Sequence, residues 1–393
     1  MIEESEAYAL LKKHVRPVSR FADVPIHECL GQVAAADVVS QFPMPMFANA
    51  MVDGYALTSG AHEAGESFRV IGEQAAGIDQ GLSLALGETA RIFTGAPLPQ
   101  GTDSVIMQEV VKVLDKGTIQ IEEAIGAGKG LRQQGDDLLA GQKILSTGEA
   151  LTPQRLALLA SQGHSTVNVR PHPRVHVFST GDELRPLGEE LAPGQLYESN
   201  ALMMCLSGTA QGWPGWTRAH VADDPEELKQ AIAEAAASND FLFLSGGVSV
   251  GDHDHVRSVL DSLGMREHFW RVRVQPGKPV LFGTLGDCHV LGLPGNPISS
   301  FVSFHLFGVP AIQHWLGVPV SPREKAILNR PVSNDGNRPH YLRGHFDPET
   351  RTFGSVGLQK SHGMLGLSKA NAIARIPPMT QSDEGSEVEI LRV

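Results

Sequence analysis

The sequence predicts a multidomain protein of the α/β and β classes, built around a central parallel α/β domain. Strand-like and helix-like segments alternate from residue 174 to about 316, which is typical of βαβ units on a parallel sheet. Short β-like runs separated by Gly, Pro, Asp and Asn fill residues 20–150. After Pro322 the helical pattern stops and short strand-like segments follow, so we expect a small terminal β-domain.

The amino-terminal region is expected to open with a short amphipathic helix. Apolar positions recur at helical spacing over residues 3–13, Ser5 can cap the start, and Arg16-Pro17 marks the end. The β-like runs that follow lie at 31–39, 67–71, 88–92, 104–107, 110–113 and 118–121.

The next helix is predicted over residues 152–160, because Thr152 can cap it and Pro153 occupies its first position. In the central region, strands are expected at 175–178, 217–221 and 241–244, and helices at 200–211, 225–237 and 254–263. The terminal β-domain is expected to have strands at 326–332, 341–346, 372–376 and 387–393.

The composition indicates a folded protein and excludes some partners. The chain has 393 residues, of which 41% are hydrophobic, and its net charge of −12 leaves no general cationic surface for nucleic acid. No apolar stretch approaches the roughly 20 residues that span a bilayer, and the acidic start does not resemble a secretion signal. We therefore expect a cytoplasmic protein without nucleic-acid or membrane partners.

The three cysteines give no framework for disulfides or metal. Cys29, Cys205 and Cys288 are far apart and show no C-x-x-C spacing, so we expect reduced thiols in the core. The run Asp252-His253-Asp254-His255 invites a zinc or iron interpretation, but no second histidine pair follows at matching spacing, and solvated histidines are the favoured reading.

Two polar loops follow strands of the predicted parallel sheet. Residues 245–254 combine glycines and hydroxyls after the strand at 241–244, and residues 179–184 do so after the strand at 175–178. Ligands of such sheets lie off the carboxyl ends of the strands, so the first loop is a candidate phosphate cradle. Glu183 and Asp254 would face one crevice and suggest a divalent ion or a purine-like or pterin-like edge. A ligand-free turn and solvated carboxylates remain the alternatives.

Two proline-rich turns end later β-runs. They are Gln275-Pro276-Gly277-Lys278-Pro279 and Leu293-Pro294-Gly295-Asn296-Pro297. Lys278 on a stiffened loop is either an anion contact or a solvated lysine. No Walker, dinucleotide-binding or nucleophile-elbow motif is present, so an NTPase, a dehydrogenase or an α/β-hydrolase is not supported.

Taken together, several motifs resemble the molybdopterin molybdenumtransferase family, which includes the carboxyl-terminal E region of gephyrin. The resemblance covers nearly the whole chain, and the order and spacing of the motifs make it specific. The motifs are 49–56 (NAMVDGYA), 93–96 (FTGA), 101–109 (GTDSVIMQE), 132–137 (RQQGDD) and the four loops described above.

The resemblance implies a subunit of four parts and a homodimer. The parts are an elongated linker region (1–44 and 132–170), an inserted β domain (45–131), an α/β molybdopterin-binding domain (171–320) and a small β-barrel (321–393). It also implies a site between the α/β domain of one subunit and the inserted domain of the other.

The implied reaction is insertion of molybdate into adenylylated molybdopterin, with Mg²⁺-dependent release of AMP and the finished molybdenum cofactor. The upstream adenylyltransferase and apo-molybdoenzymes are possible partners. The resemblance assigns catalytic roles to Asp53, Thr94, Asp137, Glu183, Asp223, Ser249 and Asp254, with Glu183 and Asp254 as magnesium ligands. It assigns substrate binding to Ser245, Gly246, Gly247, Lys278, Pro294, Pro297, Arg343 and Ser361, of which Lys278, Arg343 and Ser361 would hold molybdate.

The sequence departs from the family pattern at a few positions. Ala48 replaces an aspartate, Val52 a methionine, and Gln275 a lysine at the start of the K-P-G-K turn. The loss of that lysine weakens one molybdate contact. Alternatives are a deamidase or adenylyltransferase with the same α/β domain type, an inactive relative, and a scaffold protein.

Overall fold

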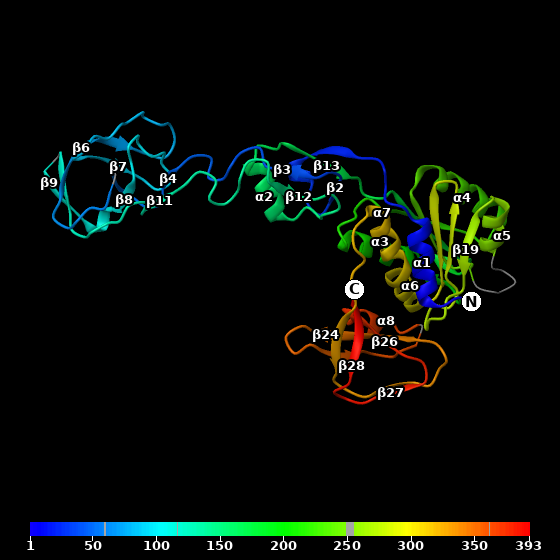
Figure 1. Cartoon of the computed structure of the whole chain (residues 1–393). Helices are drawn as coiled ribbons and strands as arrows, with labels where there is room; N and C mark the ends of the chain where they lie inside the picture. The colour runs from blue at the N-terminus through cyan, green and yellow to red at the C-terminus, as the bar shows by residue number, and fades with distance from the viewer. Residues whose placement is uncertain (59, 116, 249–254, 361) are drawn as a thin grey trace. The chain divides into compact units, whose positions relative to one another are not determined.

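The computed structural model describes residues 1–58, 60–115, 117–248, 255–360 and 362–393. The chain forms two compact units, one of residues 36–147 and 153–165, the other of residues 1–35, 148–152 and 166–393. Figure 1 shows the elements of both. No helix among these residues is long and apolar enough to cross a membrane.

The smaller unit is built around a six-stranded sheet. Its strand order is β8 (Ser104–Met107), β5 (Gly54–Leu57), β7 (Glu88–Ile92), β6 (Ser67–Gln74), β10 (Thr118–Ile121) and β9 (Val111–Asp115). The other elements are the turn η2 (Gln108–Val110), the helix α2 (Pro153–Ser161), and the pairs β4 (Asn49–Ala50) with β11 (Leu131–Arg132) and β3 (Val38–Val39) with β12 (Lys143–Leu145). The central strand β5 is buried on alternate sides, since Ala56 and Leu57 belong to two separate apolar clusters.

The larger unit contains the α/β domain. Its sheet has the order β17 (Thr217–Val221), β14 (Val175–Thr180), β18 (Phe241–Ser245), β21 (Cys288–Leu293), β20 (Leu281–Leu285) and β19 (Arg266–Trp270). The first four strands are parallel, which confirms the predicted fold class. β20 and β19 add an antiparallel edge that the sequence analysis did not predict. The two-residue connection between β20 and β21 allows this hairpin, with Gly286 at φ +59°.

Helices cover both faces of this sheet. One layer holds α4 (Pro225–Ser238) and α5 (His255–Ser262), and the other holds α1 (Glu4–His14), α3 (Asn200–Ala210), α6 (Pro297–Ser303), the π-helical turn η3 (Phe304–Gly308) and α7 (Val309–Leu316). Side chains of β18 alternate between the layers: Phe241 and Phe243 pack on the second, Leu242 and Leu244 on the first. All four are fully buried.

A closed five-stranded β-barrel follows, as the sequence predicts. Its strands are β22 (Glu324–Leu328), β25 (Thr352–Ser355), β24 (His340–Asp347), β26 (Ala372–Ile376) and β28 (Glu387–Arg392). The ribbon β23 (Val332–Asn334) with β27 (Thr380–Ser382) and the helix α8 (Met364–Leu367) complete it. The remaining small elements of this unit are β1 (Ala22–Pro25), η1 (Ile26–Glu28), β2 (Val33–Ala34), β13 (Thr166–Arg170), β15 (Leu184–Arg185) and β16 (Leu196–Tyr197).

A buried carboxylate connects the first helix to the barrel. Glu4 is 8% exposed and accepts hydrogen bonds from Arg323 and Tyr341, with Arg375 at 3.5 Å. The main chain of Gln275 also bonds to the barrel, because its N–H donates to Pro339 and its carbonyl accepts from Tyr341 (2.9 and 2.7 Å). These contacts fix the barrel against the α/β domain.

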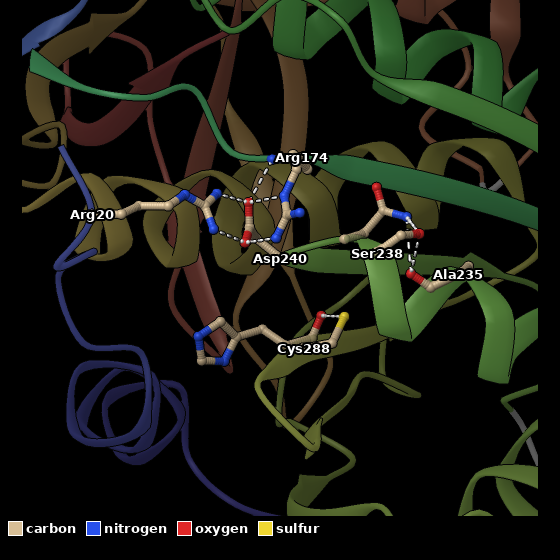
Figure 2. A network of polar contacts seen from close by, with 8 residues as sticks. Arg20, Arg174, Ala235, Ser238, Asp240 and Cys288 are labelled. Atoms are coloured by element: carbon tan, nitrogen blue, oxygen red, sulfur yellow. Dashed lines mark hydrogen bonds and ion pairs between the residues drawn. The ribbon is translucent and has the colours of Figure 1, made fainter. Parts of the chain in front are cut away.

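A second buried carboxylate joins the segment after α1 to the start of the sheet. Figure 2 shows Asp240 between Arg20 and Arg174, which both donate to its two oxygens. Burial alone would raise the pKa of Asp240, but these hydrogen bonds outweigh it and hold the pKa below its usual range.

We predict that Asp240→Asn destabilises the larger unit by about 2 kcal/mol, because a charge-assisted network is lost and both arginines are partly exposed. Calorimetry should show its transition roughly 4–8 °C lower at pH 7. Because the pKa of Asp240 is lower in the folded than in the unfolded protein, its charge stabilises the fold above the unfolded pKa of about 3.9. This stabilisation is lost as the pH falls, so the difference between the wild type and the variant should shrink below about pH 4. Asp261→Asn, at an exposed position on α5, is the matched control. Equal transitions in both variants would contradict the role of this network.

Candidate active site

A cleft of about 450 Å³ lies at the carboxyl edge of the α/β sheet. The chain passes from β14 to β17 on one side and then to β18 on the other, so the connections diverge between β14 and β18. Open α/β sheets bind ligands at this kind of switch point. The lining residues come from the loops after β14, β17, β18 and β21, and include Thr180, Gly181, Glu183, Asp223, Ser245, Gly246, Gly247, Pro294, Gly295, Asn296 and Pro297.

The glycines after β18 allow close backbone approach. Gly246 and Gly247 have φ values of +102° and +65°. A Cβ on Gly246 would lie 2.8 Å from the Thr180 carbonyl, and one on Gly247 would lie 2.4 Å from Val256. The Gly246 N–H already donates to Leu293 (3.1 Å), whereas the Gly247 N–H has no acceptor among the described residues. Of this pair, Gly247 is therefore the amide available to a ligand.

Carboxylates also line the cleft. Glu183 and Asp223 both line it, and the Asp223 N–H donates to the Asp182 side chain (3.2 Å). Burial, followed by repulsion from Asp182 and Glu183, raises the pKa of Asp223. The site thus carries more negative charge than its neighbours balance, and a cation or a donor-rich ligand would relieve it.

The structure adds two polar residues that the sequence analysis missed. The Asn200 amide donates to Ser245 Oγ (2.9 Å) and to the Gly295 carbonyl (2.7 Å), while its Oδ1 is buried without a donor among the described residues. Glu198 accepts the Ala201 N–H (2.7 Å) at the start of α3. The polar run 198–200 directly before a helix was the signal available in the sequence.

Several predicted residues lie elsewhere or outside the described residues. Ser249, Asp254 and Ser361 are outside them. Lys278 is exposed beside Pro279, which lines the cleft. Because Gln275 bonds to Pro339 and Tyr341, the turn that carries Lys278 lies next to the strand that carries Arg343.

Arg343 differs from the open cationic fork that the sequence suggested. The side chain is 1% exposed, and its guanidinium donates to the carbonyls of Leu358 (2.5 Å) and Lys360 (3.5 Å). Its Nε is buried without a partner in the described part of the chain, and burial lowers its pKa. Arg343 therefore holds the segment that precedes Ser361, with one donor still unpaired.

Asp53 and Thr94 contact each other in the smaller unit. Asp53 accepts both the N–H and the hydroxyl of Thr94 at 2.8 Å, although the two residues are distant in sequence. These hydrogen bonds, the backbone one first, lower the pKa of Asp53. Asp137 is exposed in the same unit, where its N–H donates to Met44 (2.9 Å).

A doubly covered sheet with a glycine-lined cleft at its switch point defines a class of α/β proteins that bind phosphate-bearing ligands. Three family models match this chain in order: the MoeA N-terminal region (domain I and II) at residues 2–163, a probable molybdopterin binding domain at 176–314, and the MoeA C-terminal region (domain IV) at 325–393.

Relatives match over most of the chain. The molybdopterin molybdenumtransferase 2 of Mycobacterium tuberculosis is 32% identical over 95% of this chain and 94% of its own length. The molybdopterin molybdenumtransferase of Haemophilus influenzae is 33% identical over 88% and 87%. A structure of a molybdopterin biosynthesis protein from Pyrococcus horikoshii covers 100% of this chain and 99% of its own, at 30% identity and a TM-score of 0.85. The chain belongs to the molybdopterin molybdenumtransferase family, which confirms the predicted resemblance.

We predict that Gly246→Ala destabilises the larger unit more than Gly264→Ala does. Both glycines have positive φ, but a Cβ at Gly264 meets no atom within 4 Å. The control should therefore cost about 1 kcal/mol of unfolding free energy for backbone strain alone, and Gly246→Ala about 2–4 kcal/mol with the added clash. Calorimetry measures the melting temperature of each variant. Equal melting temperatures would mean that Thr180 moves enough to remove the clash.

We predict that Thr94→Val raises the pKa of Asp53 toward its ordinary value, because one of its two hydrogen bonds disappears. The backbone N–H of Thr94 remains, so the shift should be partial. NMR titration of the Asp53 carboxyl carbon measures it. An unchanged titration would mean that the hydroxyl does not bond to Asp53 in solution.

Proposed function

We propose that this chain inserts molybdate into adenylylated molybdopterin and releases AMP and molybdenum cofactor. Family membership over nearly the whole chain supports this reaction. The observation that carries the proposal is the cleft at the switch point, which is lined both by carboxylates and by the Gly247 amide, for which the described residues offer no acceptor. Such a cleft suits a ligand with both phosphate groups and hydrogen-bond donors.

The phosphate and pterin parts would be held by the loop after β18. The Gly247 amide is the donor for a phosphate oxygen, and the Asn200 amide keeps Ser245 and Gly295 in place. The Oδ1 of Asn200, for which the described residues supply no donor, can accept a ligand N–H. Pro294 and Pro297 stiffen the facing loop, so these groups are positioned before the substrate arrives.

The carboxylates of Glu183 and Asp223 fit a magnesium ion bound together with substrate phosphates. Mg²⁺ prefers oxygen ligands and takes few carboxylates beside phosphate oxygens. Burial, and then repulsion from Asp182 and Glu183, raise the pKa of Asp223, and a bound cation would offset that repulsion. When bound, the ion would neutralise charge that develops as the phosphoanhydride bond breaks. Asp254 and Ser249 would join this set by the family resemblance.

Molybdate would bind near Arg343, Lys278 and Ser361. The buried Nε of Arg343 has no partner in the described part of the chain, so an oxyanion at that position would satisfy it. The carbonyls of Leu358 and Lys360 orient the guanidinium. Gln275 supplies an amide donor where many relatives supply a lysine. Of the residues proposed here, Lys278 and Arg343 then provide the positive charge for the molybdate dianion.

The working enzyme would be a homodimer whose second subunit contributes Asp53, Thr94 and Asp137. An apolar segment that precedes Asp53 supports a contact surface, because Phe42, Met46, Phe47 and Met51 are 44–53% exposed. The reaction also implies an adenylyltransferase that supplies the substrate and apo-molybdoenzymes that receive the product.

The first experiment measures AMP release from adenylylated molybdopterin by the purified protein, with and without molybdate and Mg²⁺. Reconstitution of an apo-molybdoenzyme is scored in parallel. Release that needs both ions and yields active cofactor supports the proposal. Consumption of ATP would instead indicate an adenylyltransferase. A folded dimer that releases no AMP under any of these conditions would indicate an inactive relative.

We predict that Glu183→Gln and Asp223→Asn each lower kcat/KM for AMP release by about 10²-fold, because the charge that positions the cation is lost. Excess Mg²⁺ should partly restore the rate. Glu190→Gln, at an exposed position between β15 and β16, is the control and should keep full activity.

The pH profile gives a second readout of the same prediction. The wild-type rate should fall at low pH once Asp223 is protonated, and this limb should be absent from Asp223→Asn. A wild-type rate in both variants, or an identical profile, would remove these carboxylates from the mechanism.

A further inference from the structure

A second cavity lies at the opposite, amino edge of the α/β sheet. Its volume is about 430 Å³, and its walls come from the segment after α1, from β19 and from the turn between β20 and β21. Asp240 and His289, at the starts of β18 and β21, are among its lining residues. The cleft described above follows the other ends of these strands, so the two sites share no lining residue.

Positive charge gathers around this cavity although the chain carries a net charge of −12. Arg16 and Arg266 line it, and neither forms an ion pair with a carboxylate among the residues described. Asp240 is shared by Arg20 and Arg174, so that network keeps one positive charge in excess (Figure 2). The remaining acid in the lining is the exposed Asp287. Cations therefore outnumber carboxylates.

Three histidines complete the lining and are poor in partners. The rings of His14 and His268 stack with centroids 3.7 Å apart and planes at 12°. His268 Nε2 lies 3.2 Å from Thr284 Oγ1. His289 is 9% exposed, and its Nδ1 is buried with no partner in the described structure. A buried ring nitrogen without a partner is costly unless a ligand or solvent compensates.

The electrostatics of the histidines favour an anion. Burial, and then His14, Arg266, His289 and Lys13, lower the pKa of His268 to about 4. Burial lowers the pKa of His289 to about 4 as well, against the pull of Asp240 and Asp287. Burial and the cations Lys13, Arg266 and Arg16 lower the pKa of His14. An anion at this position would offset the repulsion from neighbouring cations, which adds to the effect of burial on His14 and His268.

We propose that this cavity binds a tetrahedral oxyanion dianion, as a free ion or as a phosphate monoester, between Arg16 and Arg266. The guanidinium groups supply planar forks that suit such oxygens. His14 and His268 take up protons as the anion enters, so affinity rises as the pH falls. The site is independent of the proposed transferase reaction.

Isothermal titration calorimetry with sulfate tests the site, because sulfate stays a dianion across the pH range used. The wild-type protein should bind sulfate more tightly at pH 5.5 than at pH 7.5, with proton uptake measured in two buffers. The variant R16Q/R266Q should weaken this binding at least about tenfold. R330Q is the control, because it removes one positive charge, half the change of the double variant, at an exposed position of the barrel. It should leave the sulfate affinity unchanged.

Three further measurements separate the outcomes. H14Q/H268Q should bind sulfate with reduced proton uptake, which a merely structural role would not produce. AMP and inorganic phosphate distinguish the sources of the anion: tighter binding of AMP through Arg16 and Arg266 indicates a monoester, and equal binding indicates the free ion. AMP release by R16Q/R266Q should stay at the wild-type rate without added anion. Sulfate affinity that the double variant leaves intact, in a protein with an unchanged melting transition, would overturn the proposal.

Discussion

Burial of β18 on both faces is the constraint on which the rest of the structure depends. Phe241 and Phe243 pack against one helical layer and Leu242 and Leu244 against the other. Both faces of the strand are therefore covered, and neither exposes an apolar side chain to solvent. A strand enclosed in this way must have neighbours on both edges, and parallel neighbours return through helices. The loops after β14, β18 and β21 consequently leave the sheet at one edge, where Thr180, Gly246 and Gly295 come together.

The two edges of this sheet differ in the charge that they carry. Asp182, Glu183 and Asp223 repel one another at the carboxyl edge, whereas Arg16, Arg20 and Arg266 gather at the amino edge. In both places the crowding lies beside buried groups, and the effective dielectric there is lower than in water. A ligand of opposite charge gains more at such positions than at an exposed surface. The cation proposed to accompany the substrate phosphates at one end of the sheet, and the anion proposed at the other, would follow from the strand direction and a few loop residues.

Sequence patterns predicted the parts of the fold that local chemistry determines. The apolar run 241–244 followed by glycines indicated a buried strand, which the structure has, and a candidate ligand loop, whose glycines line the cleft. β20 and its antiparallel pairing with β19 and β21 were missed, because antiparallel edge strands lack the alternation with helices that marked the rest. Asn200 was missed because its role depends on Ser245 and Gly295, which only folding brings near. The burial of Arg343 likewise depends on carbonyls 15 and 17 residues away, which no local pattern records.

Asp53 illustrates how a carboxylate can be fixed without being buried. Its two hydrogen bonds from Thr94 hold one oxygen, while the residue is only partly buried. A carboxylate side chain that is not buried normally samples many rotamers, and holding it in one rotamer costs conformational entropy. Thr94 lies 41 residues away, just after the end of β7. The position of the Asp53 carboxylate therefore depends on the folded sheet of the smaller unit. Such rigidity suits a group that meets a ligand or another subunit, since its orientation is set before contact.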